Sequence, residues 1–189
     1  GGLAADTQDA QEYIASHDDA LLWAKANRAL IAKRFAGQLG ARCKPVMDSC
    51  HNSVTRIDLD GEEMWLHRKG ATASDTGPCV VPGSRGSLSY LVEPVGGQQN
   101  NLWSLAHGAG RKWPRKSCKG RLGAQFKTKA LRQTVMGNVV ICDDKQLLYE
   151  EAPQAYKNID RVIQDMVDDG LIRVLATLRP LITYKVRDS

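Results

Sequence analysis

The sequence predicts an α+β protein, with mixed strands forming a central sheet core flanked by helices. Apolar residues at helical spacing cover about 18–38, and runs typical of strands follow from Val46 onward. An amphipathic helix over 158–169 and two closing strands complete the pattern. Because helices and strands do not alternate regularly, this order favours an α+β fold over repeated βαβ units. The length suits one domain, so we expect residues 1–189 to form a single domain.

The first helix carries start and stop signals. Ser16-x-x-Asp19 has the form of a capping box, which predicts a start near residue 18 after a loop over 1–9. Gly37 and Gly40 are suited to ending the helix. His17 is expected at the surface. The large apolar side chains of the helix are expected in the core: Trp23, Leu30 and Phe35.

Short apolar runs separated by turn residues predict the strands. Asp60-Gly61 lies between two such runs, so a hairpin is expected to turn there. The other expected strands are 79–81, 88–92, 102–106, 139–142, 146–149, 172–176 and 181–185. Residues 113–135 are expected to be mostly helical, with breaks near Gly120 and Gly123.

Cysteine content and hydropathy indicate the cellular environment of the protein. Five cysteines without a CxxC pair indicate reduced thiols, and so a cytoplasmic location. No apolar run approaches the roughly 20 residues of a membrane span, and the N-terminus does not resemble a signal peptide. We therefore expect no membrane partner.

Positive charge is concentrated in one part of the chain. The net charge is +5, and residues 94–142 contain nine basic residues and no acidic one. The basic residues are Arg111, Lys112, Arg115, Lys116, Lys119, Arg121, Lys127, Lys129 and Arg132. This stretch is either a surface for a polyanion, since phosphate contacts dominate nucleic-acid affinity, or a solvated basic face.

A candidate reactive group stands where the expected strand 102–106 ends. His107 is followed by two glycines and Arg111. Backbone N–H groups there can cradle phosphate oxygens, Arg111 can clamp them bidentately, and a neutral imidazole can attack phosphorus. A glycine-rich turn with a surface histidine is the ordinary alternative, because a lone Gly-x-Gly is a weak signal.

Six short motifs occur in one order along the chain. They are Cys50-His51-Asn52, His67-Arg68-Lys69-Gly70-Ala71, Pro82-Gly83-Ser84-x-Gly86-x-x-Ser89, His107-Gly108-Ala109-Gly110-Arg111, Ala155-Tyr156-Lys157-x-Ile159-Asp160, and Leu178-Arg179 with Lys185. Together they resemble the RtcB family of GTP- and manganese-dependent RNA ligases. The resemblance runs from about Trp23 to Lys185 and covers only the C-terminal part of the longer family members.

The resemblance implies an activity. His107 would be guanylated by GTP, and the GMP would activate an RNA 3′-phosphate, formed from a 2′,3′-cyclic phosphate, for joining to a 5′-hydroxyl. The cofactors implied are GTP and Mn²⁺, and the partners implied are such RNA ends and an archease-type activating protein. The physiological setting implied is tRNA splicing or RNA repair.

The resemblance also implies site residues. His51 would be a manganese ligand, and the other family ligands come from a region upstream of this chain, so we expect this stretch alone to be inactive. The implied nucleotide-binding residues are His51, Asn52, Pro82, Gly83, Ser84, Arg85, Ser89, His107, Gly108, Ala109, Gly110, Arg111, Tyr156 and Lys185. The residues expected to contact RNA are His67, Arg68, Lys69, Lys112, Arg115, Lys116 and Lys119.

The chain departs from the family pattern at informative places. Family members commonly carry Met where Arg85 stands, and many end at a Lys-Gly where Lys185 is followed by Val186. Two other functions remain open from the residues themselves. One is a non-catalytic RNA-binding domain that uses residues 111–132, and the other is a metal-dependent phosphohydrolase built on His51, His67 and His107.

Overall fold

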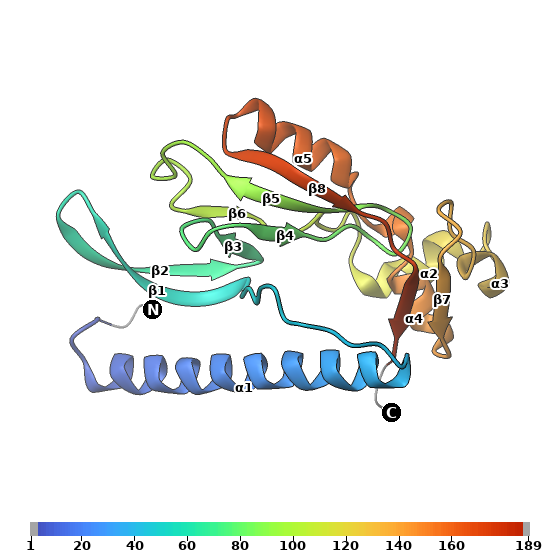
Figure 1. Ribbon diagram of the computed structural model, residues 1–189, viewed down its shortest axis with the longest axis horizontal. Helices are drawn as coiled ribbons and strands as arrows, with labels where there is room; N and C mark the ends of the chain where they lie inside the picture. Colours follow the sequence, from blue (N-terminus) through green and yellow to red (C-terminus); the bar gives the residue numbers. More distant parts are fainter. Residues whose placement is uncertain (1–3, 187–189) are drawn as a thin grey trace. The chain divides into compact units, whose positions relative to one another are not determined.

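The computed structural model describes residues 4–186. The chain divides into two compact units at the boundary between Ala73 and Ser74. Helices and several small sheets make up both units (Figure 1), which confirms the α+β class. The expectation of a single domain over 1–189 stays a prediction. None of the helices in residues 4–186 combines the length and the apolarity that crossing a membrane requires.

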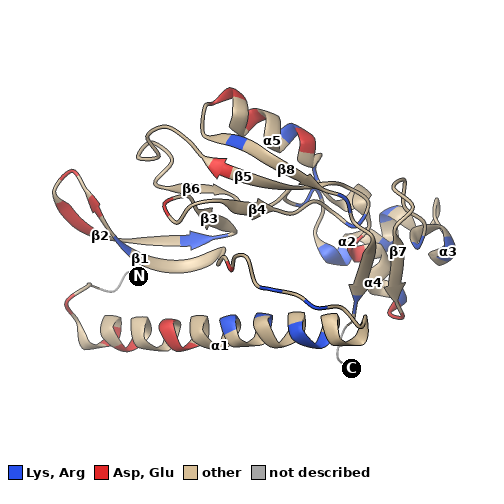
Figure 2. Ribbon diagram, in the orientation of Figure 1, with Lys and Arg blue, Asp and Glu red and all other residues tan. Residues whose placement is uncertain are grey.

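The first unit begins with the long helix α1, Gln8–Gln38. Its start is ten residues earlier than predicted, because Thr7 provides the cap: the Thr7 Oγ1 accepts a hydrogen bond from the Ala10 N–H at 3.3 Å. Acidic residues gather in its first half and basic residues in its second (Figure 2), which suits the helix dipole. The predicted end is confirmed, with Gly40 in the left-handed region at φ 63°.

The expected burial of the helix's apolar side chains is wrong. The exposed fractions are 70% for Trp23, 43% for Leu30 and 42% for Phe35, and Ala10 is the buried residue of α1. An apolar stripe is buried only where another layer covers it. Within the first unit the hairpin meets the N-terminal half of α1, so no described layer of that unit covers the stripe farther along.

The predicted hairpin is confirmed. β1, Asn52–Leu59, pairs antiparallel with β2, Glu62–Lys69, and β3, Ala71–Ala73, follows. Asp60 and Gly61 both have positive φ, at 57° and 86°, as a type I′ turn requires. His17 links α1 to this hairpin: its Nε2 accepts a hydrogen bond from the Val54 N–H at 3.0 Å, so it is not the surface residue that the sequence suggests.

The second unit contains a three-stranded antiparallel sheet in the order β4-β5-β8. These strands are Cys79–Val81, Ser89–Pro94 and Ile172–Leu178. Helix α5, Ile159–Asp168, lies along β8 (Figure 1) and buries Ile159, Ile163 and Met166 against the sheet residues. The Asn158 side chain caps it by accepting from the Asp160 N–H at 2.8 Å. The predicted helix and its inward face are confirmed.

Most of the remaining elements of the second unit pack around a separate apolar cluster. They are α2 (Arg115–Leu122), α3 (Thr128–Leu131), β7 (Val139–Cys142), α4 (Lys145–Glu150) and the 3₁₀ turn Pro153–Ala155. β6 (Ser104–Ala106) instead buries Leu105 in the cluster of the sheet and α5, and β9 (Ile182–Lys185) completes the unit. β7 and β9 pair in parallel. Leu148 lies at the centre of the separate cluster and is fully buried.

Two strand predictions need correction here. Residues 146–149 are helical, because the Asp144 carboxylate caps α4 by accepting from the Gln146 and Leu147 N–H groups at 2.7 and 3.0 Å. The strand expected over 102–106 begins only at Ser104, since Leu102 and Trp103 have positive φ, at 51° and 47°.

A hydrogen bond between the sheet and α5 supplies the first testable prediction. The Tyr90 hydroxyl on β5 donates to the Asp160 carboxylate on α5 at 2.6 Å. This bond, with burial and the charge of Asp160, raises the pKa of Tyr90 to about 12. Tyr90→Phe should lower the free energy of unfolding by about 2 kcal/mol, the order for a bond to a charged group.

Urea denaturation at pH 7 checks this expectation. The matched control is Tyr184→Phe, because Tyr184 is 55% exposed, and that change should stay within about 0.5 kcal/mol of the wild type. Equal stabilities of the two variants would show that the Tyr90–Asp160 bond does not hold α5 to the sheet.

Candidate functional site

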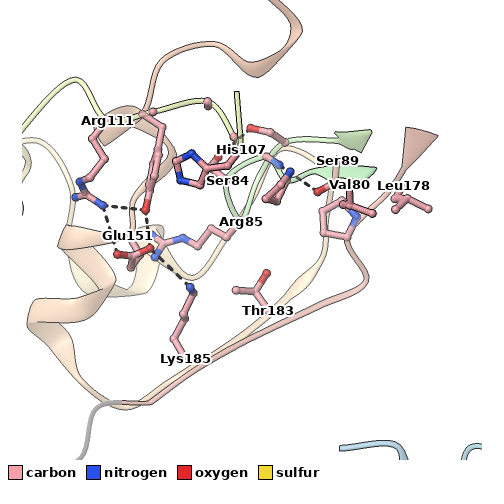
Figure 3. Close-up of a pocket in the computed structure, with 18 of the residues that line it drawn as sticks. Val80, Ser84, Arg85, Ser89, His107, Arg111, Glu151, Leu178, Thr183 and Lys185 are labelled. Atoms are coloured by element: carbon pink, nitrogen blue, oxygen red, sulfur yellow. Dashed lines mark hydrogen bonds and ion pairs between the residues drawn. The ribbon is translucent and has the colours of Figure 1, made fainter. Parts of the chain in front are cut away.

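The second unit contains a cavity of about 850 Å³ at which His107, the β4–β5 loop, the end of α4 and strand β9 meet (Figure 3). Its lining is strongly positive. The basic residues that line it are Arg85, Arg111, Arg115, Arg179 and Lys185, and the acidic residue among the described lining is Glu151. A cavity with this balance of charge is suited to an anionic ligand.

His107 directly follows β6 and reaches this cavity. The loop after it is fixed to the segment 155–157 by two backbone hydrogen bonds: the Lys112 N–H donates to the Ala155 carbonyl at 2.7 Å, and the Lys157 N–H donates to the Gly110 carbonyl at 3.0 Å. Two of the motifs found along the chain therefore form one structural unit that holds the imidazole in place.

The β4–β5 loop forms the facing wall. A Cβ on Gly108 would lie 3.1 Å from the Pro82 carbonyl oxygen, so the histidine loop approaches this wall closely. The Ser89 hydroxyl accepts a hydrogen bond from the Gly83 N–H at 3.1 Å, and the Ser84 and Ser87 hydroxyls lie 2.8 Å apart. Ser84 and Ser89 line the cavity as expected, and both also hold the loop closed.

Arg111 differs from its expected role as a phosphate clamp. Its Nη1 donates to the Tyr156 hydroxyl at 2.8 Å and lies 3.4 Å from Glu151 Oε1. Its Nε donates to the Trp113 carbonyl at 3.2 Å, and its Nη2 donates to the Glu150 carbonyl. The guanidinium also lies over the Tyr156 ring, 4.7 Å from its centroid. Protein acceptors therefore occupy this guanidinium, which supports the wall of the cavity.

Glu151 is the residue that sequence reasoning missed. Its carboxylate accepts from the Tyr156 hydroxyl at 2.6 Å and lies 3.7 Å from Lys185 Nζ and 3.6 Å from Arg115 Nε. Burial alone would raise the pKa of Glu151, but the Tyr156 bond and the nearby cations outweigh it, and the pKa is lowered. Apart from Tyr156, these partners are at least 34 positions away in the sequence, so no local motif marks Glu151. The available signal was an acidic residue in a chain that also contains a strongly basic stretch.

Tyr156 connects the two apolar clusters of the second unit. Burial and then the bond to Glu151 raise the pKa of its hydroxyl to about 12, so it stays a neutral donor at physiological pH. Lys185, at the end of β9, lines the cavity beside Glu151 (Figure 3). The structure thus brings together His107, Tyr156 and Lys185, which the sequence places far apart.

The Glu151 network predicts a pH-dependent stability. Glu151→Gln should lower the free energy of unfolding at pH 7 by about 2 kcal/mol, since it removes the negative charge that strengthens the Tyr156 hydrogen bond and leaves neighbouring cations uncompensated. Because the folded state lowers the pKa of Glu151, this stabilisation is present above the unfolded pKa and is lost as pH falls through the folded one. Urea denaturation at pH 7 and pH 3.5 should show the difference between wild type and variant narrowing.

The matched control for this prediction is Glu63→Gln. Glu63 forms an ion pair with Arg56 at 3.0 Å, but both side chains are more than 60% exposed, so the change should cost less than about 1 kcal/mol. A Glu151→Gln loss no larger than that of the control would contradict the assigned network.

The predicted residues of the first unit take several places. Gly70 closes the base of the hairpin, where its N–H donates to the His51 carbonyl at 2.7 Å and the Asn52 side chain at 2.9 Å. His67 is exposed and stacks on Tyr13, and Lys69 is exposed. Arg68 is buried and donates to the Thr55 hydroxyl at 2.9 Å, so it does not fit an exposed RNA contact.

No three His, Cys, Asp or Glu side chains among residues 4–186 come together in a way that could hold a metal ion. The described residues therefore do not fit a complete manganese site, and the role of His51 as a ligand stays a prediction.

The basic stretch is largely exposed. Helix α2 contains basic positions (Figure 2). Its Arg115, Lys116 and Lys119 are exposed, and so is Lys112 just before it. Of the nine basic residues, Arg111 alone is partly buried. The charge is therefore available to a polyanion.

A cationic cavity with a fixed histidine at a strand end is suited to a ligand that carries phosphate. Comparison with known families is more specific: the family "tRNA-splicing ligase RtcB" matches residues 2–186, and the chain belongs to it. This confirms the family that the motifs suggested.

Individual proteins with sequences similar to this chain carry the same family name. The chain is 52% identical to RNA-splicing ligase RtcB2 of Escherichia coli over 97% of its own length and 48% of that protein. It is 32% identical to tRNA-splicing ligase RtcB of Nanoarchaeum equitans, over 95% of this chain and 43% of that protein. The corresponding protein of Pyrococcus abyssi is 30% identical over 93% of this chain and 22% of its own length. The chain thus spans about half the length of these relatives, or less.

Proposed function

We propose that this chain is the nucleotide-binding part of an RNA ligase that joins RNA 3′-phosphate or 2′,3′-cyclic phosphate ends to 5′-hydroxyl ends through a guanylated His107. The observation that carries the proposal is the position of His107. It stands at a strand end, beside a cavity of about 850 Å³ whose described lining has five basic side chains and one acidic one. The names of the relatives support RNA joining as the overall activity.

The first step would be covalent. A neutral imidazole nitrogen of His107 attacks the α-phosphorus of GTP, a P–N bond forms, and the bond to the β-phosphate breaks with release of pyrophosphate. An oxygen of the RNA 3′-phosphate then takes the GMP from His107. Finally the 5′-hydroxyl attacks the activated 3′-phosphate and GMP leaves.

Support for the guanine nucleotide comes from the cavity walls. Tyr156 and Lys185 supply a neutral hydroxyl and a cation, and the β4–β5 loop supplies serine hydroxyls that can donate or accept. The Mn²⁺ that the resemblance implies would neutralise phosphate charge when bound. Since residues 4–186 do not fit a complete site for it, no step of this mechanism is assigned to the metal.

A labelled-GTP assay on the full-length protein tests the proposal. Incubation with α-labelled GTP and Mn²⁺ should give a covalent, acid-labile guanylate on the protein. Either alternative, a non-catalytic RNA-binding domain or a phosphohydrolase, predicts none. RNA joining without any covalent guanylate would contradict the proposed chemistry.

RNA binding by the basic stretch supplies a further prediction. Changing Lys112, Arg115, Lys116 and Lys119 together to Ala should weaken binding of single-stranded RNA. It should also reduce the slope of log affinity against log salt by about 3, at roughly 0.7 per lost phosphate contact. Fluorescence anisotropy at four salt concentrations measures both quantities.

The control removes the same charge elsewhere. Lys25, Lys33, Arg34 and Lys44 are exposed residues of the first unit and lie outside the basic stretch. If replacing these four residues by Ala changes RNA affinity and salt dependence as much as replacing the first set does, the binding reflects net charge alone. The basic stretch is then only a solvated face.

A further inference from the structure

Arg85 is a buried cation with two unused donors. The residue is 7% exposed and lines the cavity. Its Nε and Nη2 atoms are buried and have no hydrogen-bond partner among the described residues. Figure 3 shows the side chain extending from the β4–β5 loop toward Glu151 and Lys185. Buried polar groups in proteins are nearly always paired, so two unpaired N–H groups on one guanidinium point to a ligand.

The two unused atoms have a specific geometry. Nε–H and one Nη–H of a guanidinium point the same way and form the fork that grips two oxygens of a phosphate or carboxylate. Arg111, the arginine that the motif favours for this task, has its donors on Tyr156, the Trp113 carbonyl and the Glu150 carbonyl. Arg115 and Arg179 also line the cavity but are exposed, so Arg85 is the buried arginine of the described lining whose fork has no partner.

Charge decides which kind of acceptor fits. Burial lowers the pKa of Arg85, and its neighbours Cys142, Glu151 and Tyr156 offset this only in part. An arginine nevertheless stays charged, and a buried charge without a counter-charge is costly. Glu151 is already shared with Tyr156, Arg111, Arg115 and Lys185. A neutral base carbonyl could occupy the donors, but only an anion would also balance the charge.

We propose that Arg85 is the phosphate clamp of this cavity and binds a nucleotide phosphate through its Nε and Nη2 atoms. The inference rests on the proposed nucleotide function and deepens it by naming the group that this side chain holds. Members of the family that this chain resembles commonly carry Met at this position, and a Met side chain has no donor. Arg85 therefore gives this chain a phosphate contact that relatives with Met at this position lack.

Binding measurements on the full-length protein test the assignment without reference to activity. The probes are inorganic tripolyphosphate, GTP and guanosine, each measured by competition against a fluorescent GTP analogue. The variants are Arg85→Met, which removes both charge and fork, and Arg85→Lys, which keeps the charge and loses the fork. The control is Arg161→Met, because Arg161 is an exposed residue of α5 that pairs with Asp165 and does not line the cavity.

Loss of a charge-assisted bidentate contact should raise the dissociation constants of tripolyphosphate and GTP about 10- to 100-fold in Arg85→Met, with guanosine and the control unchanged. Arg85→Lys, which serves also if the Met variant does not fold, should weaken the same two probes about tenfold. Equal weakening of guanosine, no weakening at all, or a wild type that does not bind tripolyphosphate would overturn the assignment. If tripolyphosphate binding depends on Arg85 but GTP binds no more tightly than tripolyphosphate, the assignment of Arg85 stands and the proposed guanine-nucleotide function is contradicted.

Discussion

Replacing His107 with Ala is expected to abolish joining of RNA that carries a 3′-phosphate, by roughly 10⁴-fold or more, the order found when a catalytic nucleophile is removed. His107 is held at the end of β6 by a loop that two hydrogen bonds fix to residues 155–157. Those bonds use backbone atoms, so the loop does not need the imidazole. The fold should therefore survive, with a melting temperature within a few degrees of the wild type.

A pre-activated substrate separates loss of the nucleophile from damage to the site. RNA already carrying GMP on its 3′-phosphate needs no protein guanylate. His107→Ala should still seal this RNA to a 5′-hydroxyl end, whereas it should not seal RNA with a plain 3′-phosphate. Failure on both substrates would mean that His107 supports the site in another way.

Gly83→Ala is expected to have the largest effect on stability. A Cβ at this position would lie 2.0 Å from the Leu88 carbonyl oxygen, and that atom belongs to the backbone, which cannot move aside cheaply. The same glycine donates through its N–H to the Ser89 hydroxyl, so the loop that forms one wall of the cavity would open. We expect a loss of about 3 kcal/mol in the free energy of unfolding, the upper part of the range for overpacking, together with weaker nucleotide binding.

The control for this change is Gly97→Ala. Gly97 is exposed and a Cβ there would meet no atom within 4 Å. Its stability by urea denaturation should equal or slightly exceed that of the wild type, since alanine restricts the unfolded chain more than glycine does. A Gly83→Ala protein as stable as this control would show that the loop is not packed as described.

Local patterns predicted the elements that carry their own signals. Asp60-Gly61 predicted the hairpin because a type I′ turn needs positive φ at both positions, and an amphipathic pattern over 158–169 predicted α5. Residues 146–149 were wrongly predicted as a strand, because a short apolar run fits a helix or a strand equally well. Asp144 was the overlooked cap. The exposure of Trp23 could not be predicted, since a helical apolar stripe does not say what covers it.

Sequence reasoning indicated several residues of the cavity but not the contacts that each one makes. The resemblance to the family indicated His107, Tyr156 and Lys185, and all three line the cavity. Which arginine keeps free donors depends on acceptors such as Glu150 and Tyr156, which only folding brings near. Glu151 lacks a local motif for the same reason. Such contacts are tertiary and leave no periodic trace in the sequence.

Peptide mapping by mass spectrometry tests the central claim most directly. The full-length wild-type protein is incubated with GTP and Mn²⁺, digested under mildly alkaline conditions that preserve phosphoramidates, and searched for peptides that carry GMP. The account predicts one guanylated peptide, with the modification on His107. A guanylate on any other residue, or active RNA joining with no guanylate on the protein, would contradict it.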